Sequence, residues 1–224
     1  KNGNFMKPAA FEYSKTKIDR AGELLKNKSA SANDMANALD ILSSWRAYHA
    51  IPVDTFATVL RQRSQKISAQ AVVAQRLKRT PSILLKLSNH KTMRLSAMQD
   101  IGGLRAILAT NEEVYKLLDV YKKSKSKHSL FSLDDYIETP KKDGYRSIHL
   151  IYKLAKTPNL FLEIQLRSQL QHIWATGVEV FGTLKNSSFK SGQGSRKWLD
   201  FFSLLSSVFA IKESLCLISG PARL

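Results

Sequence analysis

Residues 135–149 read Asp-Tyr-Ile-Glu-Thr-Pro-Lys-Lys-Asp-Gly-Tyr-Arg-Ser-Ile-His, and residues 163–167 read Glu-Ile-Gln-Leu-Arg. The first stretch surrounds Gly144 with basic and aromatic side chains, namely Lys141, Lys142, Tyr145, Arg146 and His149. In the second stretch polar and apolar residues alternate, so Glu163, Gln165 and Arg167 share one face of a predicted strand. A basic loop with a glycine, beside a strand that carries a carboxylate, indicates a site for a polyphosphate and a metal ion.

The composition indicates a globular protein with a sizeable core. The chain has 224 residues, of which 43% are hydrophobic, enough for one large domain or a domain with an appendage. The only cysteine is Cys216, which excludes an internal disulfide framework and favours a reducing, cytoplasmic location. No apolar run reaches the roughly 18 residues that a membrane span needs. We therefore expect no membrane partner.

The charge is strongly positive and clustered. The formal net charge is +17, and no acidic residue occurs between Asp54 and Asp100 or between Val180 and Leu199. A further basic run consists of Lys122, Lys123, Lys125 and Lys127. Clustered basic residues attract polyanions such as nucleic acid. The alternative is a solvated basic surface that serves solubility alone.

Helical spacing of apolar residues predicts a helical N-terminal region. We expect helices over 12–27 and 32–47, with Ser14 and Ser31 as N-caps. Pro52 is expected to break this pattern, and Asp54 to cap a helix over 54–79. A short helix is predicted over 82–88, after the Thr80-Pro81 pair.

The middle of the chain reads as alternating strands and helices. Strands are predicted over 103–109, 146–154 and 160–167, the last two joined by a turn around Pro158 and Asn159. Helices are predicted over 111–123, with Asn111 as its cap, and over 168–184 and 196–213. A polar connection covers 124–144, and a loop contains Gly192 and Gly194.

This order predicts an α+β fold in which a small mixed β-sheet is flanked by helices, with N-terminal helices and a C-terminal helix. We expect an N-terminal helical region over 1–68, a catalytic core over 69–190, and a C-terminal helix and tail over 191–224. The sequence leaves open whether a regulatory region follows the tail.

Five motifs resemble the synthetase domain of the RelA/SpoT alarmone enzymes, over roughly residues 70–190. The loop at 135–149 has the form DYI-x-x-PK-x-x-GYRS-x-H and the strand at 163–167 the form EIQ-x-R. The others are R-x-K-x-x-x-S-I-x-x-K-L from Arg76, DI-x-G-x-R from Asp100, and H-x-W-A from His172. The resemblance implies the nucleotidyltransferase-like fold of that family and its nucleotide site.

The resemblance assigns roles to the two carboxylates. From spacing alone, Asp100 reads as an ordinary turn carboxylate. By the resemblance it is the metal-binding aspartate, and Glu163 is the catalytic glutamate that helps to activate the attacking hydroxyl. Two such carboxylates can hold a Mg²⁺ ion that also bridges phosphate oxygens.

The resemblance also assigns residues to the two substrates. ATP is expected to contact Arg76, Lys78, Ser82, Lys86 and Arg105, because basic groups neutralise the donor phosphates. Tyr145 is expected to stack on the acceptor base. The remaining acceptor-binding candidates are Lys141, Arg146, His149, Gln165, Arg167 and His172. Trp174 is expected to serve packing.

One departure concerns the helix after Trp174. Many family members follow the Trp-Ala pair with Glu-His, whereas this chain has Thr176-Gly-Val-Glu179 and no histidine there. The role of Glu179 is therefore open.

The implied reaction is transfer of the β,γ-pyrophosphate of ATP to a ribose 3′-hydroxyl. No histidine is followed by aspartate, so the HD motif of the family's hydrolase domain is absent, and the chain is expected to make its product without degrading it.

Three readings of the function follow. The first is a translation-inhibiting toxin that modifies the 3′ end of tRNA. The segments beginning at Trp45 and at Lys197 resemble fused toxin–antitoxin members used in phage defence, which implies an antitoxin region or protein as partner. The net charge favours this reading, with a predicted tRNA-binding track of Arg61, Arg63, Lys122, Lys123, Lys125 and Lys127. The second is a (p)ppGpp synthetase that acts on GDP or GTP. The third is an inactive RNA-binding module, which the intact Asp100 and Glu163 disfavour.

Overall fold

The computed structural model of the chain describes residues 12–27, 29–155, 160–185, 189 and 194–214. In the first half the elements are α1 (Lys15–Lys26), α2 (Ala32–Tyr48), α3 (Ala50–Ile67), β1 (Val72–Leu77), α4 (Thr80–Asn89), the short 3₁₀ helix η1 (Leu95–Ala97), β2 (Gly102–Leu108) and α5 (Asn111–Lys123). They are followed by β3 (Ser129–Asp135), β4 (Ile148–Lys153), β5 (Phe161–Ser168), α6 (Gln169–Leu184) and α7 (Arg196–Lys212).

The strands form one five-stranded mixed sheet in the order β1-β2-β5-β4-β3. Strands β2 and β5 are parallel, and the other neighbouring pairs are antiparallel. The sheet with its flanking helices confirms the predicted α+β class. In the described part of the chain, no helix has both the length and the apolar character needed to cross a membrane.

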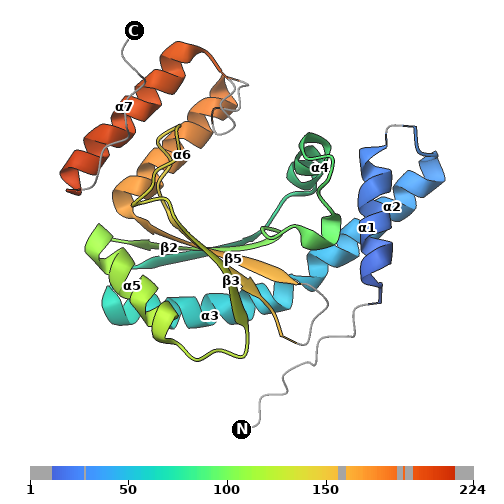
Figure 1. The fold of residues 1–224 in the computed structure, drawn as a ribbon, viewed down its shortest axis with the longest axis horizontal. Helices are drawn as coiled ribbons and strands as arrows, with labels where there is room; N and C mark the ends of the chain where they lie inside the picture. Colours follow the sequence, from blue (N-terminus) through green and yellow to red (C-terminus); the bar gives the residue numbers. More distant parts are fainter. Residues whose placement is uncertain (1–11, 28, 156–159, 186–188, 190–193, 215–224) are drawn as a thin grey trace.

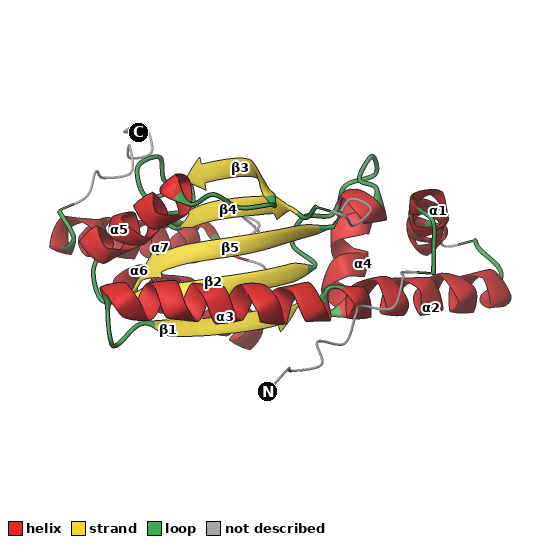
Figure 2. Ribbon diagram, turned by 90° about the horizontal axis from the view of Figure 1, so that it is seen from below, coloured by secondary structure: helices red, strands yellow, loops and turns green. Residues whose placement is uncertain are grey.

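The two faces of the sheet have different roles. Alternate residues such as Leu104, Ile164 and Leu166 are buried on one face, which α3 and α5 cover. This alternation is the period-2 pattern expected of strands with one face against a core. On the other face α6 and α7 rise from one end of the sheet and α4 from the other, which leaves the middle of that face between them (Figure 1). Figure 2 shows α3 lying across the covered face.

The predicted helix over 54–79 is wrong in its second half. Helix α3 ends at Ile67, and residues 72–77 form the edge strand β1, which pairs antiparallel with β2 from Val72↔Ile107 to Leu77↔Gly102. Two adjacent valines at the start of β1 suit a strand better than a helix. The pairing with β2 is a tertiary contact that local spacing does not show.

The predicted break at Pro52 and two predicted caps are also wrong. Helix α3 begins at Ala50, so Pro52 lies in its first turn, where a proline removes no helical hydrogen bond. His49 is therefore the residue that caps α3, and Asp54 lies inside the helix. At α5 the side chain of Thr110, rather than Asn111, accepts from the backbone N–H of Glu113. The caps at Ser14 and Ser31 are confirmed.

The predicted connection over 124–144 contains strand β3. Its residues alternate weakly and are largely exposed, so the sequence signal is poor, and the strand exists because it pairs with β4 at the sheet edge. The predicted turn around Pro158 and Asn159 and the position of Gly192 lie outside the described residues.

A second, smaller core lies apart from the sheet, between α6 and α7. It contains the buried residues Trp174, Ala175, Val178, Phe189 and Phe202. Tyr145, from the loop before β4, packs against this cluster. The loop at 135–149, called the acceptor loop below because it carries predicted acceptor-binding residues, therefore contacts both the sheet and the α6–α7 pair.

The junction of α2 and α3 buries a histidine. His49 is 0% exposed, and its Nδ1 lies 2.8 Å from the carbonyl oxygen of Trp45. Its Nε2 is buried without a hydrogen-bond partner among the described residues. Burial lowers the pKa of His49 from 6.5 to about 4, although the bond to Trp45 acts in the opposite direction.

We predict that this histidine makes the fold sensitive to acid. Between pH 6.5 and 4 the unfolded chain protonates His49 while the folded chain does not, so stability falls as the pH falls. The free energy of unfolding should drop by about 2 kcal/mol from pH 7 to pH 5 through this group. Urea titrations of wild type and His49→Gln at both pH values measure the difference. The exposed His90→Gln is the control, and an equal pH dependence in all three proteins would contradict the prediction.

Candidate active site

Asp100 stands at the start of β2 and is held by two lysines from different elements. Its Oδ2 accepts a 2.8 Å hydrogen bond from Lys78 Nζ, and its Oδ1 accepts one of 2.9 Å from Lys86 Nζ. Lys78 directly follows β1, and Lys86 lies in α4. The sheet and α4 thus bring together three residues that the sequence separates.

The Asp100 carboxylate is ionised despite its partial burial. Burial acts to raise its pKa, but the charges and hydrogen bonds of Lys86 and Lys78 outweigh this effect and lower the pKa below the ordinary value. Two cations with one anion leave a local positive excess, which suits a phosphate-bearing ligand.

Glu163 lies on β5, where it pairs with Gly103 of β2. Its Oε1 is 2.9 Å from His149 Nδ1, and its Oε2 accepts a 2.8 Å bond from Gln165 Nε2. Burial acts to raise the pKa of Glu163, and His149 lowers it. The charge of Asp100 acts in the same direction as burial. The net effect is a lowered pKa, so Glu163 is ionised at neutral pH.

A chain of polar contacts runs from Glu163 across the sheet. The Tyr145 hydroxyl lies 2.6 Å from His149 Nε2 and accepts a 2.6 Å bond from Arg167. Arg167 also donates to Gln165 Oε1 at 2.8 Å, and Arg105 donates to the same oxygen at 3.3 Å. Strand pairing explains this row, because Arg105 and His149 both pair with Gln165, from opposite sides.

Arg105 is close to other cations. Burial, followed by the charges of Arg167 and Arg76, lowers the pKa of Arg105 to about 10. The guanidinium groups are held together although they repel each other, and a polyanion would relieve that repulsion.

The loop before β4 adds aromatic and cationic side chains that lie against one another. Lys141 Nζ lies 4.3 Å from the ring centre of Tyr136 and 5.2 Å from that of Tyr145. The Tyr136 ring meets His149 edge-on at 5.2 Å. Tyr136 was not predicted as a site residue, although it stands in the quoted 135–149 stretch. The signal that could have identified Tyr136 is that it is an aromatic residue in the same motif as Tyr145.

Helix α6 supplies two further groups. Burial, then the charges of Arg105 and Arg167, lower the pKa of His172. Glu179 lies two turns later and raises the pKa of Arg105 through its charge. It also lines a hollow of about 140 Å³, together with Ala74, Gln75, Arg76, Gly103, Leu104, Arg105, Glu163 and Gln165. Glu179 thus lies at the site despite its altered sequence context.

Three further predicted residues differ in their burial and contacts. Arg146 is 4% exposed and donates from Nη1 to the carbonyl oxygen of Ile137 at 2.9 Å, on the side of the loop that faces α7. Ser82 is exposed in the first turn of α4. Trp174 donates its indole N–H to the carbonyl oxygen of Phe202 at 2.8 Å, in keeping with a packing role.

The predicted tRNA-binding residues lie on α3, at the end of α5 and in the connection that follows. These helices cover the face of the sheet opposite the carboxylates (Figure 1). Arg61 and the four lysines are exposed. Arg63 instead donates to Ser124 Oγ at 2.6 Å and stacks over the Tyr121 ring at 4.6 Å, so it supports the fold.

The carboxylate pair fits a magnesium ion that is shared with phosphates. Mg²⁺ is usually held by one or two carboxylates and completes its shell with water and phosphate oxygens. Asp100, two residues before β2, and Glu163, on the adjacent strand β5, would supply two such oxygen ligands. Among the described residues, no group of three or more His, Cys, Asp or Glu side chains could hold a metal by itself.

These features define an α+β domain with two buried or half-buried carboxylates in a basic setting. The sequence pattern described as "Region found in RelA / SpoT proteins" matches residues 75–188. The chain belongs to the RelA/SpoT family.

Relatives in this family match part of the chain. GTP pyrophosphokinase YwaC of Bacillus subtilis is 32% identical over 84 residues, which cover 35% of this chain and 40% of that protein. Probable GTP diphosphokinase RSH3 of Arabidopsis thaliana, a chloroplast protein, is 34% identical over 126 residues, which cover 54% of this chain and 16% of that protein. The matched region is thus well under two thirds of either relative.

A solved structure has the same fold over most of its length. Small alarmone synthetase 2 from Bacillus subtilis superposes with a TM-score of 0.63 at 23% sequence identity, covering 77% of this chain and 94% of that one. This likeness supports the architecture described above.

We predict that Asp100→Asn destabilises the fold, because Lys78 and Lys86 lose their shared counter-charge. The three side chains are 15–31% exposed, so the loss in free energy of unfolding should be about 1–3 kcal/mol, below that of a fully buried pair. Chemical denaturation at neutral pH measures it. Glu112→Gln, which breaks an exposed ion pair with Lys116, is the control and should leave stability unchanged. Equal stability of both variants and wild type would count against the prediction.

Proposed function

We propose that this chain transfers the β,γ-pyrophosphate of ATP to a ribose 3′-hydroxyl and releases AMP. One observation carries the proposal. The carboxylate of Asp100, two residues before β2, is held by two lysines, and that of Glu163, on the parallel strand β5, is held by a histidine that contacts Tyr145. The site therefore has a cationic half suited to a triphosphate donor and an aromatic half suited to a nucleoside acceptor.

In the donor half, Lys78 and Lys86 are placed to neutralise the ATP phosphates, with Arg76 and Arg105 facing the adjoining hollow. ATP carries about four negative charges, so several cations are needed. Mg²⁺, held by Asp100 and Glu163, would supply further charge neutralisation when bound. Ser82 is close in sequence to Lys86 and is assigned a supporting contact.

In the acceptor half, Glu163 is ionised and can accept the proton of the ribose hydroxyl. The hydroxyl oxygen bonds to the β-phosphorus, and the bond from that phosphorus to the oxygen of the α-phosphate breaks. AMP leaves with that oxygen. Tyr145 is assigned to the acceptor base, and Lys141, Arg167 and His172 to its phosphates. Most of the barrier reduction would come from alignment and electrostatics.

The first candidate acceptor is the 3′ end of tRNA, which would make the protein a translation-inhibiting toxin. Its support is the net charge of +17, because binding of a long polyanion gains from many cations. Helix α5, which carries Lys122 and Lys123, covers the face of the sheet opposite the one that carries Glu163, so an RNA that used these lysines would pass around the edge of the sheet (Figure 1).

The second candidate acceptor is GDP or GTP. Its support is the names of the relatives, which are GTP pyrophosphokinases or diphosphokinases. Small alarmone synthetase 1 from Bacillus subtilis, a protein of the same fold, has been solved bound to its product pppGpp and to AMPCPP.

The test is transfer of label from γ-³²P-ATP to bulk tRNA, to GDP or to GTP. We expect label on the acceptor with wild type and at least a hundredfold loss with Glu163→Gln, which keeps the shape of the side chain but cannot accept a proton. Glu138→Gln, an exposed position on the same loop, is the control. Label on guanosine nucleotides alone would overturn the tRNA assignment. Full activity of Glu163→Gln, or none in wild type, would favour a binding module.

A second prediction concerns the lysine run. Changing Lys122, Lys123, Lys125 and Lys127 together to Gln should leave the fold intact, because all four are exposed. If tRNA is the acceptor, the KM of the variant for tRNA should be higher than that of wild type and should depend less on salt concentration. The KM for GDP should stay the same. Label-transfer assays at two salt concentrations measure both. An equal loss with both acceptors would refute a role for these lysines in RNA binding.

A further inference from the structure

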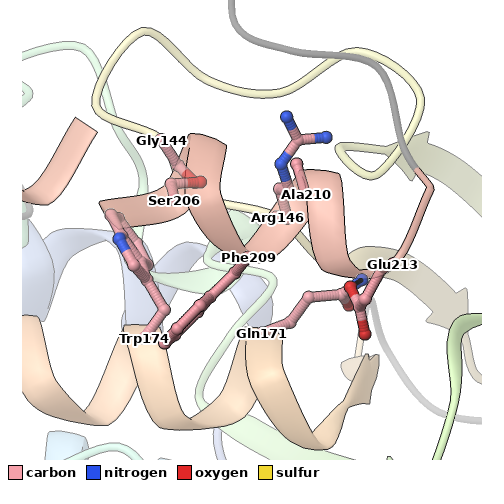
Figure 3. Close-up of a pocket in the computed structure, with 8 residues that line it drawn as sticks. All are labelled: Gly144, Arg146, Gln171, Trp174, Ser206, Phe209, Ala210 and Glu213. Carbon is pink, nitrogen blue, oxygen red and sulfur yellow. Dashed lines mark hydrogen bonds between the residues drawn. The ribbon is translucent and has the colours of Figure 1, made fainter. Parts of the chain in front are cut away.

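Helix α7 touches the acceptor loop through one buried hydroxyl. Ser206 Oγ donates a 2.6 Å hydrogen bond to the carbonyl oxygen of Gly144, and Ser206 is 2% exposed. The two residues are 62 positions apart in the sequence. Figure 3 shows Ser206 beside Gly144, with Trp174 next to both.

The contact with Ser206 requires a glycine at position 144. Its φ is +95°, a conformation that side chains other than glycine rarely adopt. A Cβ at this position would lie 2.8 Å from Ser206 Cβ and 3.2 Å from the Trp174 ring. The backbone of Gly144 therefore approaches α7 and α6 more closely than any other residue type allows.

Backbone hydrogen bonds within the loop hold the residues on either side of Gly144. Lys141 N donates to the carbonyl oxygen of Tyr145, and Gly144 N donates to that of Lys141. The backbone of Tyr145 is also held by Asp143, whose Oδ1 accepts from its N–H at 2.9 Å. A displacement of Gly144 would consequently move its neighbour Tyr145.

Helix α7 is fixed in turn by α6. The indole N–H of Trp174 donates to the carbonyl oxygen of Phe202 at 2.8 Å, one turn before Ser206. The Trp174 ring also meets the rings of Phe202 and Tyr145 edge-on, both at 6.5 Å. The small α6–α7 core therefore reaches the side chain of Tyr145 as well as the loop backbone.

We propose that Ser206 is a positioning residue for the acceptor: its hydrogen bond to Gly144 sets the place of Tyr145 and thereby the affinity for the acceptor nucleoside. This inference rests on the proposed function and adds to it a residue outside the matched region 75–188. Ser206 acts on binding through the loop and touches no reacting group. The Asp100 lysine pair belongs to the other half of the site, so ATP binding should not depend on Ser206.

The test compares Ser206→Ala with Ser207→Ala. Ser207 is the neighbouring serine, and its hydroxyl bonds only within the helix, to the carbonyl oxygen of Ser203. Loss of one buried hydrogen bond should raise the acceptor KM roughly five- to tenfold in Ser206→Ala. The KM for ATP and the kcat should change less than twofold. Ser207→Ala should match wild type in all three constants, measured with bulk tRNA and with GDP.

A second readout does not depend on catalysis. Amide hydrogen exchange of the 141–147 segment, in the absence of substrates, should be faster in Ser206→Ala than in wild type or Ser207→Ala. Gly144→Ala pushes the loop from its own side and should give the same changes.

The outcomes separate this inference from the proposed function. If wild type labels no acceptor, the proposed function fails, and hydrogen exchange alone decides whether Ser206 holds the loop. Unchanged exchange in Ser206→Ala overturns the inference. So does a KM that rises equally for ATP and the acceptor, since that would indicate a general effect on the fold.

Discussion

The parallel pairing of β2 with β5 is the contact on which the site depends. It sets Glu163 opposite Gly103 of β2, the strand that begins two residues after Asp100. A one-residue slip would turn Glu163, Gln165 and Arg167 into the apolar core. The buried leucines and isoleucines that alternate with them hold the register, so the same packing that stabilises the sheet also aligns the polar row.

The charged groups of the site are stable because each has partners. Burial by itself would raise the pKa of both carboxylates, and the lysines around Asp100 and the histidine beside Glu163 reverse that effect. Arg105 and Arg167 share the oxygen of Gln165 while they repel each other. Such unrelieved positive charge is typical of a surface arranged to receive a polyanion.

The acceptor half is built from parts that are distant in sequence. Tyr145 contacts His149 and Arg167 on the sheet and packs against the core between α6 and α7. Ser206 of α7 holds the backbone one residue before it. The C-terminal helix therefore holds the loop of the proposed nucleotide site, although the residues matched to the family end before it.

The sequence by itself determined the α+β class, the helices with clear apolar spacing, and nearly all of the polar groups that gather at the site, because these are local patterns of residue type. It could not reveal β1 or β3, since each is an edge strand whose weak alternation gains stability only from pairing with a neighbour. Nor could it show that Arg146 points away from the other loop residues while Glu179 faces Arg105, because those directions follow from backbone geometry. The tertiary structure alone decided which charges meet, because contacts between Lys78 and Asp100 or between Ser206 and Gly144 arise only when separate elements pack together.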